Sequence, residues 1–187
     1  MRLRPITIIA AVAVSLALGA CGNKEAKVTH GSTEGTYLNV GGLYYQVQIS
    51  RQLNPRDSED RDYLVGVNPS DATLKPDETW FAVFMRVQNA STKTAHQAAT
   101  EYVIRDTQGN VFNPMPLGRD NVFAYHAANV APKGIIPDGD AAAAETPIQG
   151  SLLLFKIPYA NLENRPLELE IVSPKNAQDT GTVALDV

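Results

Sequence analysis

The sequence contains few of the residues on which disulfide-stabilised proteins and many enzymes depend. Only one of its 187 residues, Cys21, is a cysteine, which excludes a disulfide within the chain. Aromatic residues make up only 7%, but apolar residues make up 44%, enough for an ordinary hydrophobic core. The chain also lacks the G-x-S-x-G turn of a serine nucleophile and the glycine-rich loops that bind phosphate. We therefore expect a protein that is not an enzyme.

Positive charge is also scarce. Lysine and arginine number 16 against 20 acidic residues, for a net charge of −4, and no run of basic residues occurs. A chain of this kind does not favour nucleic acid as a partner, and no basic segment would draw it to anionic lipid. If the protein is bound to a membrane, the sequence predicts that something other than charge holds it there.

Long apolar runs are absent except near the N-terminus. Residues 1–5 carry two arginines, and residues 6–18 carry no charge, which is the layout of a secretory signal and too short for a membrane span. The segment that follows, Leu18-Gly19-Ala20-Cys21, resembles the lipobox of bacterial lipoproteins. The resemblance implies that residues 1–20 are a cleaved signal peptide and that Cys21 becomes the lipidated N-terminus. It also implies that acyl chains hold the protein on the extracytoplasmic side of the cell membrane or outer membrane.

The segment after the predicted cleavage site is rich in Gly, Ser, Thr and Lys. With almost nothing to bury, residues 21–36 are expected to form a flexible tether between the lipid and a folded domain. His30 lies in this segment and is expected to be solvated.

From residue 37 onward, apolar and polar residues alternate with the period of β-strands. The alternation predicts one buried face on each of several strands, and the strand that begins at Trp80 is apolar on both faces at its start. The expected inward positions are Leu43, Tyr45, Val47, Ile49, Phe81, Val83, Met85, Val87, Tyr102, Ile104, Leu153, Phe155, Ile157, Leu167, Leu169, Ile171, Val183, Leu185 and Val187.

These strands alternate with turns and not with helices. Residues 106–110 read as a hairpin turn, residues 63–67 as a weaker strand, and residues 159–164 as one helical turn. We therefore expect residues 37–187 to form an all-β fold, an antiparallel immunoglobulin-like β-sandwich of about seven to nine strands. The connection 113–150 is unusually long for a sandwich, and its 120–132 part is expected to hold an extra strand.

Three segments resemble a family of immunoglobulin-like, telokin-like domains of bacterial envelope lipoproteins. They are the strand 78–89 that ends in Asn89, the Pro137-Asp138-Gly139 corner, and the strand 150–158 with its Phe-x-x-Pro ending. The members of that family are mostly without an assigned function. The resemblance therefore implies a fold and a location only.

No group of residues predicts a metal or cofactor site. His30, His96 and His126 are far apart in the sequence, and the one cysteine is the expected lipid anchor. Asp138-Gly139-Asp140 is followed by four alanines, which favours a solvated turn over a calcium loop.

The remaining candidates have ordinary structural explanations. The charged run 51–62 has alternating signs, as an exposed loop does, and neither Glu101 nor Glu145 has a predicted carboxylate partner. Trp80 is expected in the core. Four apolar side chains on outer strand faces need either a cover, for which the 113–150 loop is the best candidate, or a binding partner; they are Tyr44, Phe84, Leu152 and Leu154.

Two functions remain open at this point. The first is a non-enzymatic binding, adhesion or assembly module with a protein partner in the cell envelope. The second is a hydrolase or a small-ligand-sensing lipoprotein with its site under the 113–150 loop. A deep cleft that gathers Arg119, His126 and acidic side chains would favour the second function, and a filled core with shallow grooves the first.

Overall fold

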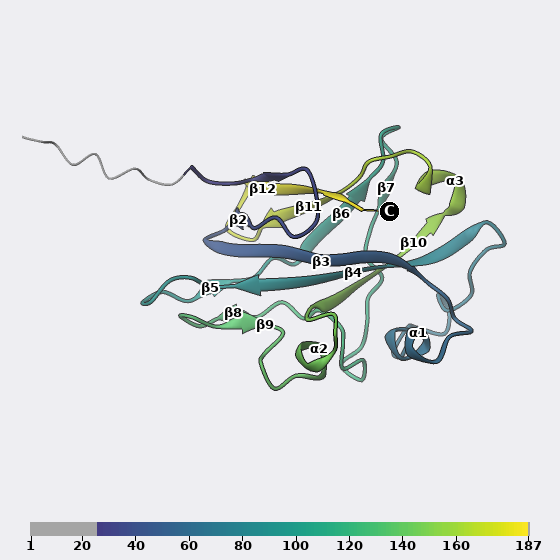
Figure 1. Ribbon diagram of the computed structural model, residues 1–187, viewed down its shortest axis with the longest axis horizontal. Helices are drawn as coiled ribbons and strands as arrows, with labels where there is room; N and C mark the ends of the chain where they lie inside the picture. Colours follow the sequence, from purple (N-terminus) through teal and green to yellow (C-terminus); the bar gives the residue numbers. More distant parts are fainter. Residues whose placement is uncertain (1–25, 187) are drawn as a thin grey trace, which may run out of the picture.

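A computed structural model describes residues 26–186 as a mostly β fold (Figure 1). One sheet consists, in spatial order, of β1 (His30–Gly31), β12 (Asn176–Leu185), β11 (Leu167–Ser173), β6 (Glu101–Arg105) and β7 (Val111–Phe112). A second sheet consists of β10 (Ser151–Pro158), β4 (Glu78–Gln88), β3 (Leu43–Leu53) and β2 (Leu38–Val40), with β9 (Ile135–Ile136) paired to β4. A short ribbon joins β5 (His96–Gln97) to β8 (Asn129–Val130).

The strand pairing is antiparallel except between β1 and β12, which run parallel. In the described part of the chain, seven strands have three or more residues and five have only two. The prediction of an all-β fold is confirmed as a mostly β fold, which also has three short helices in residues 26–186. The extra strand expected within 120–132 is β8. It has only two residues, too few for the alternation of apolar and polar residues to predict its bounds.

An inner core fills the space between the two five-stranded sheets. It takes alternate residues from each long strand, among them Phe81 of β4, Phe155 of β10 and Leu169 of β11, all fully buried. Since each side chain of this kind contributes roughly 1.5–3 kcal/mol when removed from water, this layer is the main stabilising element of the fold.

The alternation breaks in the middle of β3. Val47 pairs with Met85 and Ile49 pairs with Phe84, so Gln48 is an extra residue in a β-bulge. A bulge reverses which face the following residues occupy. The prediction that Ile49 points inward is therefore wrong, because its side chain is 36% exposed whereas Ser50 is buried.

A second, outer core covers the opposite face of the β10-β4-β3 sheet. Trp80, Phe84, Leu152 and Leu154 are buried there beneath apolar side chains of two connecting segments, residues 64–74 and residues 115–148. The expectations that Trp80 is buried and that the long loop covers the outer residues are confirmed. The segment 64–74 is a second cover that alternation did not predict, and Tyr44 is only half-buried.

The charged run 51–62 is not the exposed loop that was predicted. Arg51 belongs to β3, and residues 58–63 form helix α1 (Ser58–Tyr63), whose first turn is capped by the Asp57 carboxylate. Asp60 is buried and accepts hydrogen bonds from the Arg51 guanidinium and the Asn54 backbone N–H. Burial raises the pKa of Asp60, but these bonds lower it more, so its pKa lies below the ordinary value. The strand predicted at 63–67 is also wrong, because Tyr63 ends this helix.

One end of the inner core is closed by a buried aspartate. Asp106 follows β6 and accepts hydrogen bonds from the side-chain amides of Asn110, Asn161 and Asn164. Asn161 belongs to helix α3 (Tyr159–Leu162), the predicted helical turn, and Gly109 has the positive φ of 82° that the predicted hairpin turn requires. Burial raises the pKa of Asp106, but the amide hydrogen bonds outweigh it and hold the pKa well below its usual range.

The described chain begins inside the segment that was expected to be a tether. The backbone N–H of Asn39 donates to the Val28 carbonyl, that of Thr182 donates to Thr29, and His30 Nδ1 lies 2.9 Å from Thr182 Oγ1. Residues 28–36 are therefore attached to the fold, unlike the solvated tether expected there. The predictions for residues 1–20, Cys21 and Val187 lie outside the described residues. None of the helices in residues 26–186 has the length and apolarity to cross a bilayer.

Candidate functional site

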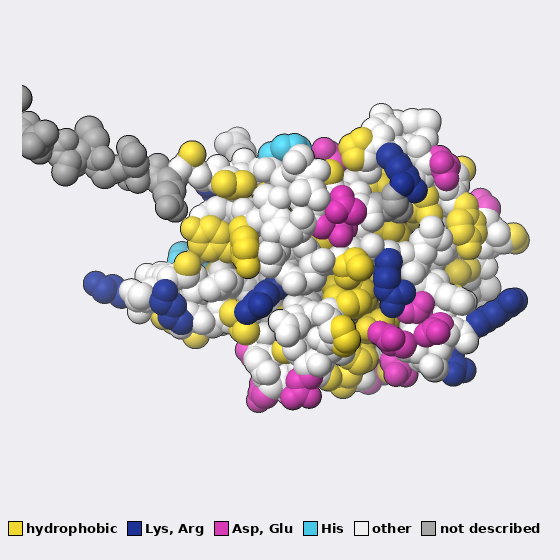
Figure 2. Space-filling view, viewed as in Figure 1, with side chains coloured by type: hydrophobic (Ala, Val, Ile, Leu, Met, Phe, Trp, Pro, Cys, Tyr) yellow, Lys and Arg dark blue, Asp and Glu magenta, His cyan; other side chains and the backbone are white. Residues whose placement is uncertain are grey.

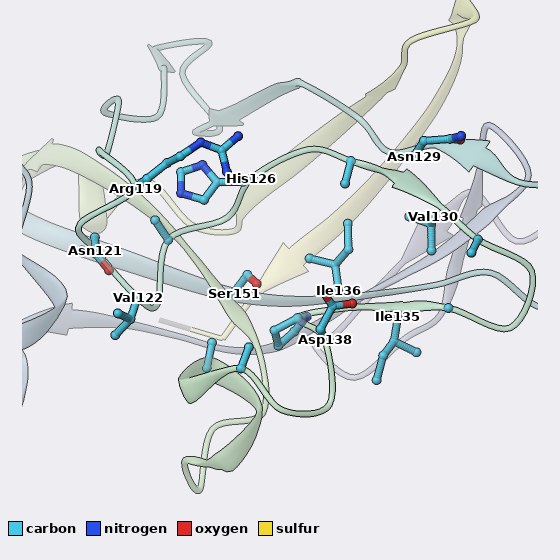
Figure 3. Close-up of a pocket in the computed structure, with 17 residues that line it drawn as sticks. Arg119, Asn121, Val122, His126, Asn129, Val130, Ile135, Ile136, Asp138 and Ser151 are labelled. Carbon is cyan, nitrogen blue, oxygen red and sulfur yellow. The ribbon is translucent and has the colours of Figure 1, made fainter.

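A cleft of about 500 Å³ lies under the 113–150 segment (Figure 3). Its walls are the stretches 119–126 and 128–138 together with helix α2 (Ala142–Glu145), and Ser151 at the start of β10 lines it as well. About 300–1,000 Å³ is the usual volume of a site for a small molecule. The alternative prediction was a site under this segment; the cleft is lined by the segment itself, together with Ser151.

Arg119 and His126 lie together on one wall of the cleft (Figure 3). Both also line an adjoining cavity of about 350 Å³ that is bordered by Tyr102, Tyr125 and Met115. Arg119 is exposed and makes no ion pair within residues 26–186. His126 Nε2 is buried with no hydrogen-bond partner, a condition that costs free energy in a folded protein.

Ser151 and Asp138 line the cleft from other elements. Gly150, directly before β10, lies so close to β4 that a Cβ at position 150 would be 2.9 Å from the Met85 backbone nitrogen, and Ser151 follows it as the first residue of β10. Asp138 is exposed and forms no salt bridge in the described part of the chain. Figure 3 shows Ser151 between the Arg119–His126 pair and Asp138. The cleft thus has cationic and imidazole groups at one side and a carboxylate at the other.

Three tyrosines make the wall behind the adjoining cavity rigid. Tyr45 accepts a hydrogen bond from the Ala99 N–H, and the hydroxyls of Tyr102 and Tyr125 both donate to the Ala99 carbonyl. The rings of Tyr102 and Tyr125 pack edge to face at 5.2 Å. Burial raises the pKa of Tyr45 to about 12 and raises the pKa values of Tyr102 and Tyr125 as well, so the three hydroxyls stay neutral, with Tyr102 and Tyr125 as donors and Tyr45 as acceptor.

Comparison with known proteins gives information on the fold alone. No protein-family description and no curated protein sequence matches the chain. The crystal structure of the yjhA protein from Bacillus subtilis is similar, with a TM-score of 0.53 and 11% identity over 83% of this chain and 99% of that chain. A crystal structure titled "Putative ApaA Protein" from Bordetella pertussis gives a TM-score of 0.34 and 14% identity over 77% of this chain and 88% of that chain. At such low identity, the likeness to yjhA shows a shared mostly β fold and nothing about activity.

The other predicted residues are scattered. His30 contacts Thr182, and His96 lies 3.3 Å from the Lys175 ammonium, both away from His126. Within residues 26–186, no three His, Cys, Asp or Glu side chains are grouped as a metal site needs. Glu101 and Glu145 are exposed, and neither lines the two cavities.

Arg119 and His126 were predicted as a possible cluster, whereas Ser151 was not predicted and Asp138 was predicted to lie in a solvated turn. The Gly-Ser pair at the start of a strand is the only local signal for Ser151, since a glycine there marks close backbone approach. Nothing local signals that Asp138 faces the same cleft, because the fold brings it there from 12 residues beyond His126.

Proposed function

We propose that this protein is a lipid-anchored binding protein of the bacterial envelope, whose cleft under the 113–150 segment binds a small zwitterionic ligand. The anchor is Cys21, on the strength of its lipobox, and the domain is an immunoglobulin-like sandwich related to those of envelope lipoproteins. The observation that carries the ligand site is the Arg119–His126 pair, which lines two adjoining cavities without a protein partner for the buried Nε2.

The chemistry of the cleft favours a ligand with a carboxylate at one end. An arginine guanidinium presents a fork of N–H donors that matches two carboxylate oxygens. Asp138, on the other side, accepts hydrogen bonds from an ammonium or amide group. A short peptide or an amino acid carries both groups.

Binding is favoured over hydrolysis by the hydrogen-bond pattern. A nucleophilic serine needs a base within about 2.6–3.2 Å. Among the described residues, no serine hydroxyl is hydrogen-bonded to a histidine, and Ser151 has no such partner. The cleft therefore has groups that orient a ligand and lacks an activated nucleophile.

The ligand site is tested by calorimetric titration of the mature chain with glycylglycine, its C-terminal amide and its N-acetyl derivative. We expect glycylglycine to bind and both derivatives to bind about tenfold more weakly, because each loses one charged hydrogen bond. Arg119→Gln should abolish discrimination against the amide, and Asp138→Asn discrimination against the N-acetyl form.

Arg56→Gln and Asp62→Asn are the matched controls, since both side chains are exposed and neither lines the cleft. Equal binding of all three peptides, or loss of binding in the control variants, would contradict the zwitterion site.

The anchor is tested separately by Cys21→Ser and membrane fractionation. We expect the native chain in the membrane fraction and the variant in the soluble fraction. A variant that stays in the membrane fraction would remove Cys21 as the anchor without affecting the ligand site.

A further inference from the structure

Five short segments meet at the end of the molecule where the described chain begins (Figure 1). They are residues 26–29, the β2–β3 turn, the loop 89–95 after β4, the loop 131–134 between β8 and β9, and the β11–β12 turn. Their hydrogen bonds link them: Gly41 N–H donates to Asp179, Lys133 N–H donates to Ser91, and Lys175 Nζ lies 3.3 Å from His96 Nδ1. We call this surface the basic end.

The basic end concentrates the scarce positive charge of the chain. It holds four exposed lysines, which are Lys27, Lys93, Lys133 and Lys175. The one acidic residue in these segments and the start of β12 is Asp179, whose carboxylate pairs with Lys27. Glu101 lies one strand away, opposite Val172 in the β6–β11 pair. Figure 2 shows Lys and Arg side chains at both ends of the visible face; at this end they stand apart from Asp and Glu side chains, whereas at the opposite end the two kinds are mixed.

Lys133, in the loop between β8 and β9, has a backbone conformation that is unfavourable for a lysine. Its φ is 62°, and it is the one residue other than glycine with a positive φ in the described part of the chain. Side chains with a Cβ disfavour this region, and glycine adopts it freely. The Lys133 ammonium also donates to the Ala90 carbonyl, which holds it against the loop 89–95. Strained residues of this kind are concentrated at functional positions.

We propose that the basic end is a membrane-facing surface that binds anionic lipid headgroups. The proposal rests on the anchoring at Cys21: Lys27 is the sixth residue after Cys21, so the chain keeps the basic end within about 20 Å of the acylated residue. Headgroups of phosphatidylglycerol carry the complementary charge. The four lysines come from separate parts of the sequence and are neighbours only in the fold, so the sequence has no basic run that would predict this surface.

The surface also orients the domain on the membrane. A lipid on Cys21 restricts only the distance between the domain and the bilayer. Contact between lysines on four separate turns and the headgroups would fix the direction as well, so that helix α1 and the outer core lie on the side facing away from the bilayer.

The test uses residues 21–187 with Cys21→Ser, so that lipidation cannot contribute. Co-sedimentation is measured with vesicles of phosphatidylcholine alone and with 30% phosphatidylglycerol, at low and at high salt. We expect binding only to the anionic vesicles and only at low salt. Each lysine near an anionic surface increases affinity roughly fivefold, so Lys93→Gln/Lys133→Gln/Lys175→Gln should bind about 100-fold more weakly.

The matched control is Arg56→Gln/Arg61→Gln/Lys75→Gln, which removes the same charge from the other end of the molecule and should bind as the parent does. Thermal unfolding of each variant establishes that it is folded. Equal loss of binding in both triple variants would reduce the effect to net charge and overturn the proposal, as would equal binding to neutral and anionic vesicles. Because this chain has no acyl group, failure here is distinct from failure of the Cys21 anchor.

Discussion

The inner and outer cores use the two faces of the same sheet but are built in different ways. The inner core joins strand to strand, with alternate residues of regular strands on both sides. The outer core joins strands to connecting segments, with Phe84 and Leu152 packed against residues such as Leu74, Met115 and Phe123. Adjacent side chains of β4 thus enter cores of different construction.

Because they are built differently, the two cores are expected to open at different free energies. Strand pairs hold the inner core by backbone hydrogen bonds along its whole length, so it opens only when the fold unfolds. The outer core is held by side-chain packing, by α1 and by isolated bridges such as Met115–Leu154. Regions with fewer backbone bonds open locally at lower free energy. The outer cover adjoins the cleft, since Phe123 packs on the outer core and its neighbours Val122 and Ala124 line the cleft.

Phe81→Ala should produce the largest effect. Phe81 is fully buried in the inner core, and its truncation should lower the free energy of unfolding by about 3–5 kcal/mol. Chemical denaturation followed by circular dichroism measures this change. A loss below about 1 kcal/mol would show that the inner core does not dominate stability.

Phe84→Ala is the matched change in the outer core, three residues along the same strand and equally buried. It should cost about 3 kcal/mol. Hydrogen exchange should accelerate most in residues 58–74 and 115–126 and least in β11, because the cover opens before the strands separate. Uniform acceleration across both sheets would show that the two cores unfold as one unit.

Asp106→Asn should cost about 2 kcal/mol, because the variant side chain cannot accept every hydrogen bond that the carboxylate accepts. The pKa of Asp106 is lowered in the fold from an ordinary value of 3.8. Its stabilising contribution is therefore complete above about pH 4 and is lost as the pH falls below it.

We expect the native protein to lose more stability than Asp106→Asn when the pH is lowered from about 4 to 2, as measured by thermal unfolding. Asp140→Asn, in an exposed turn, is the control and should retain the native pH dependence. Parallel acid profiles for the native protein and Asp106→Asn would contradict the assigned charge.

Asp60→Asn should produce the smallest effect of the four, about 1 kcal/mol, because its partner Arg51 is partly exposed and solvent screens the pair. Its pKa is also lowered, so the same loss with falling pH is expected at lower amplitude. Exchange of the α1 amides should report the change, with Asp62→Asn on the same helix as control. A larger loss of stability than for Asp106→Asn would contradict the proposed order of the two aspartates.

The sequence predicted the inner core well because alternation is a local property. Most of the inward positions expected on β4, β6, β10 and β11 are buried. The prediction for Ile49 was wrong because the amino-acid composition does not reveal the extra residue of a β-bulge. Helix α1 was overlooked in a charged run, although Asp57 as its N-cap and the acidic residues that follow were a legible signal.

The site was predictable only in part for a different reason. Arg119 and His126 lie in one loop, and their proximity was a reasonable expectation. Ser151, Asp138 and the lysines of the basic end come together through the topology of the sheets, which brings together residues that are 12 to 148 positions apart in the sequence. No local pattern carries that information.

The attachment of residues 28–36 has a mechanical consequence. This segment is tied to β12 at Thr182 in one sheet and, through Val28 and Gly35, to β2 and β3 in the other. A force applied at the N-terminus by a moving membrane would be shared between both sheets and would not peel one edge strand. Tension on the proposed anchor would therefore load both sheets together.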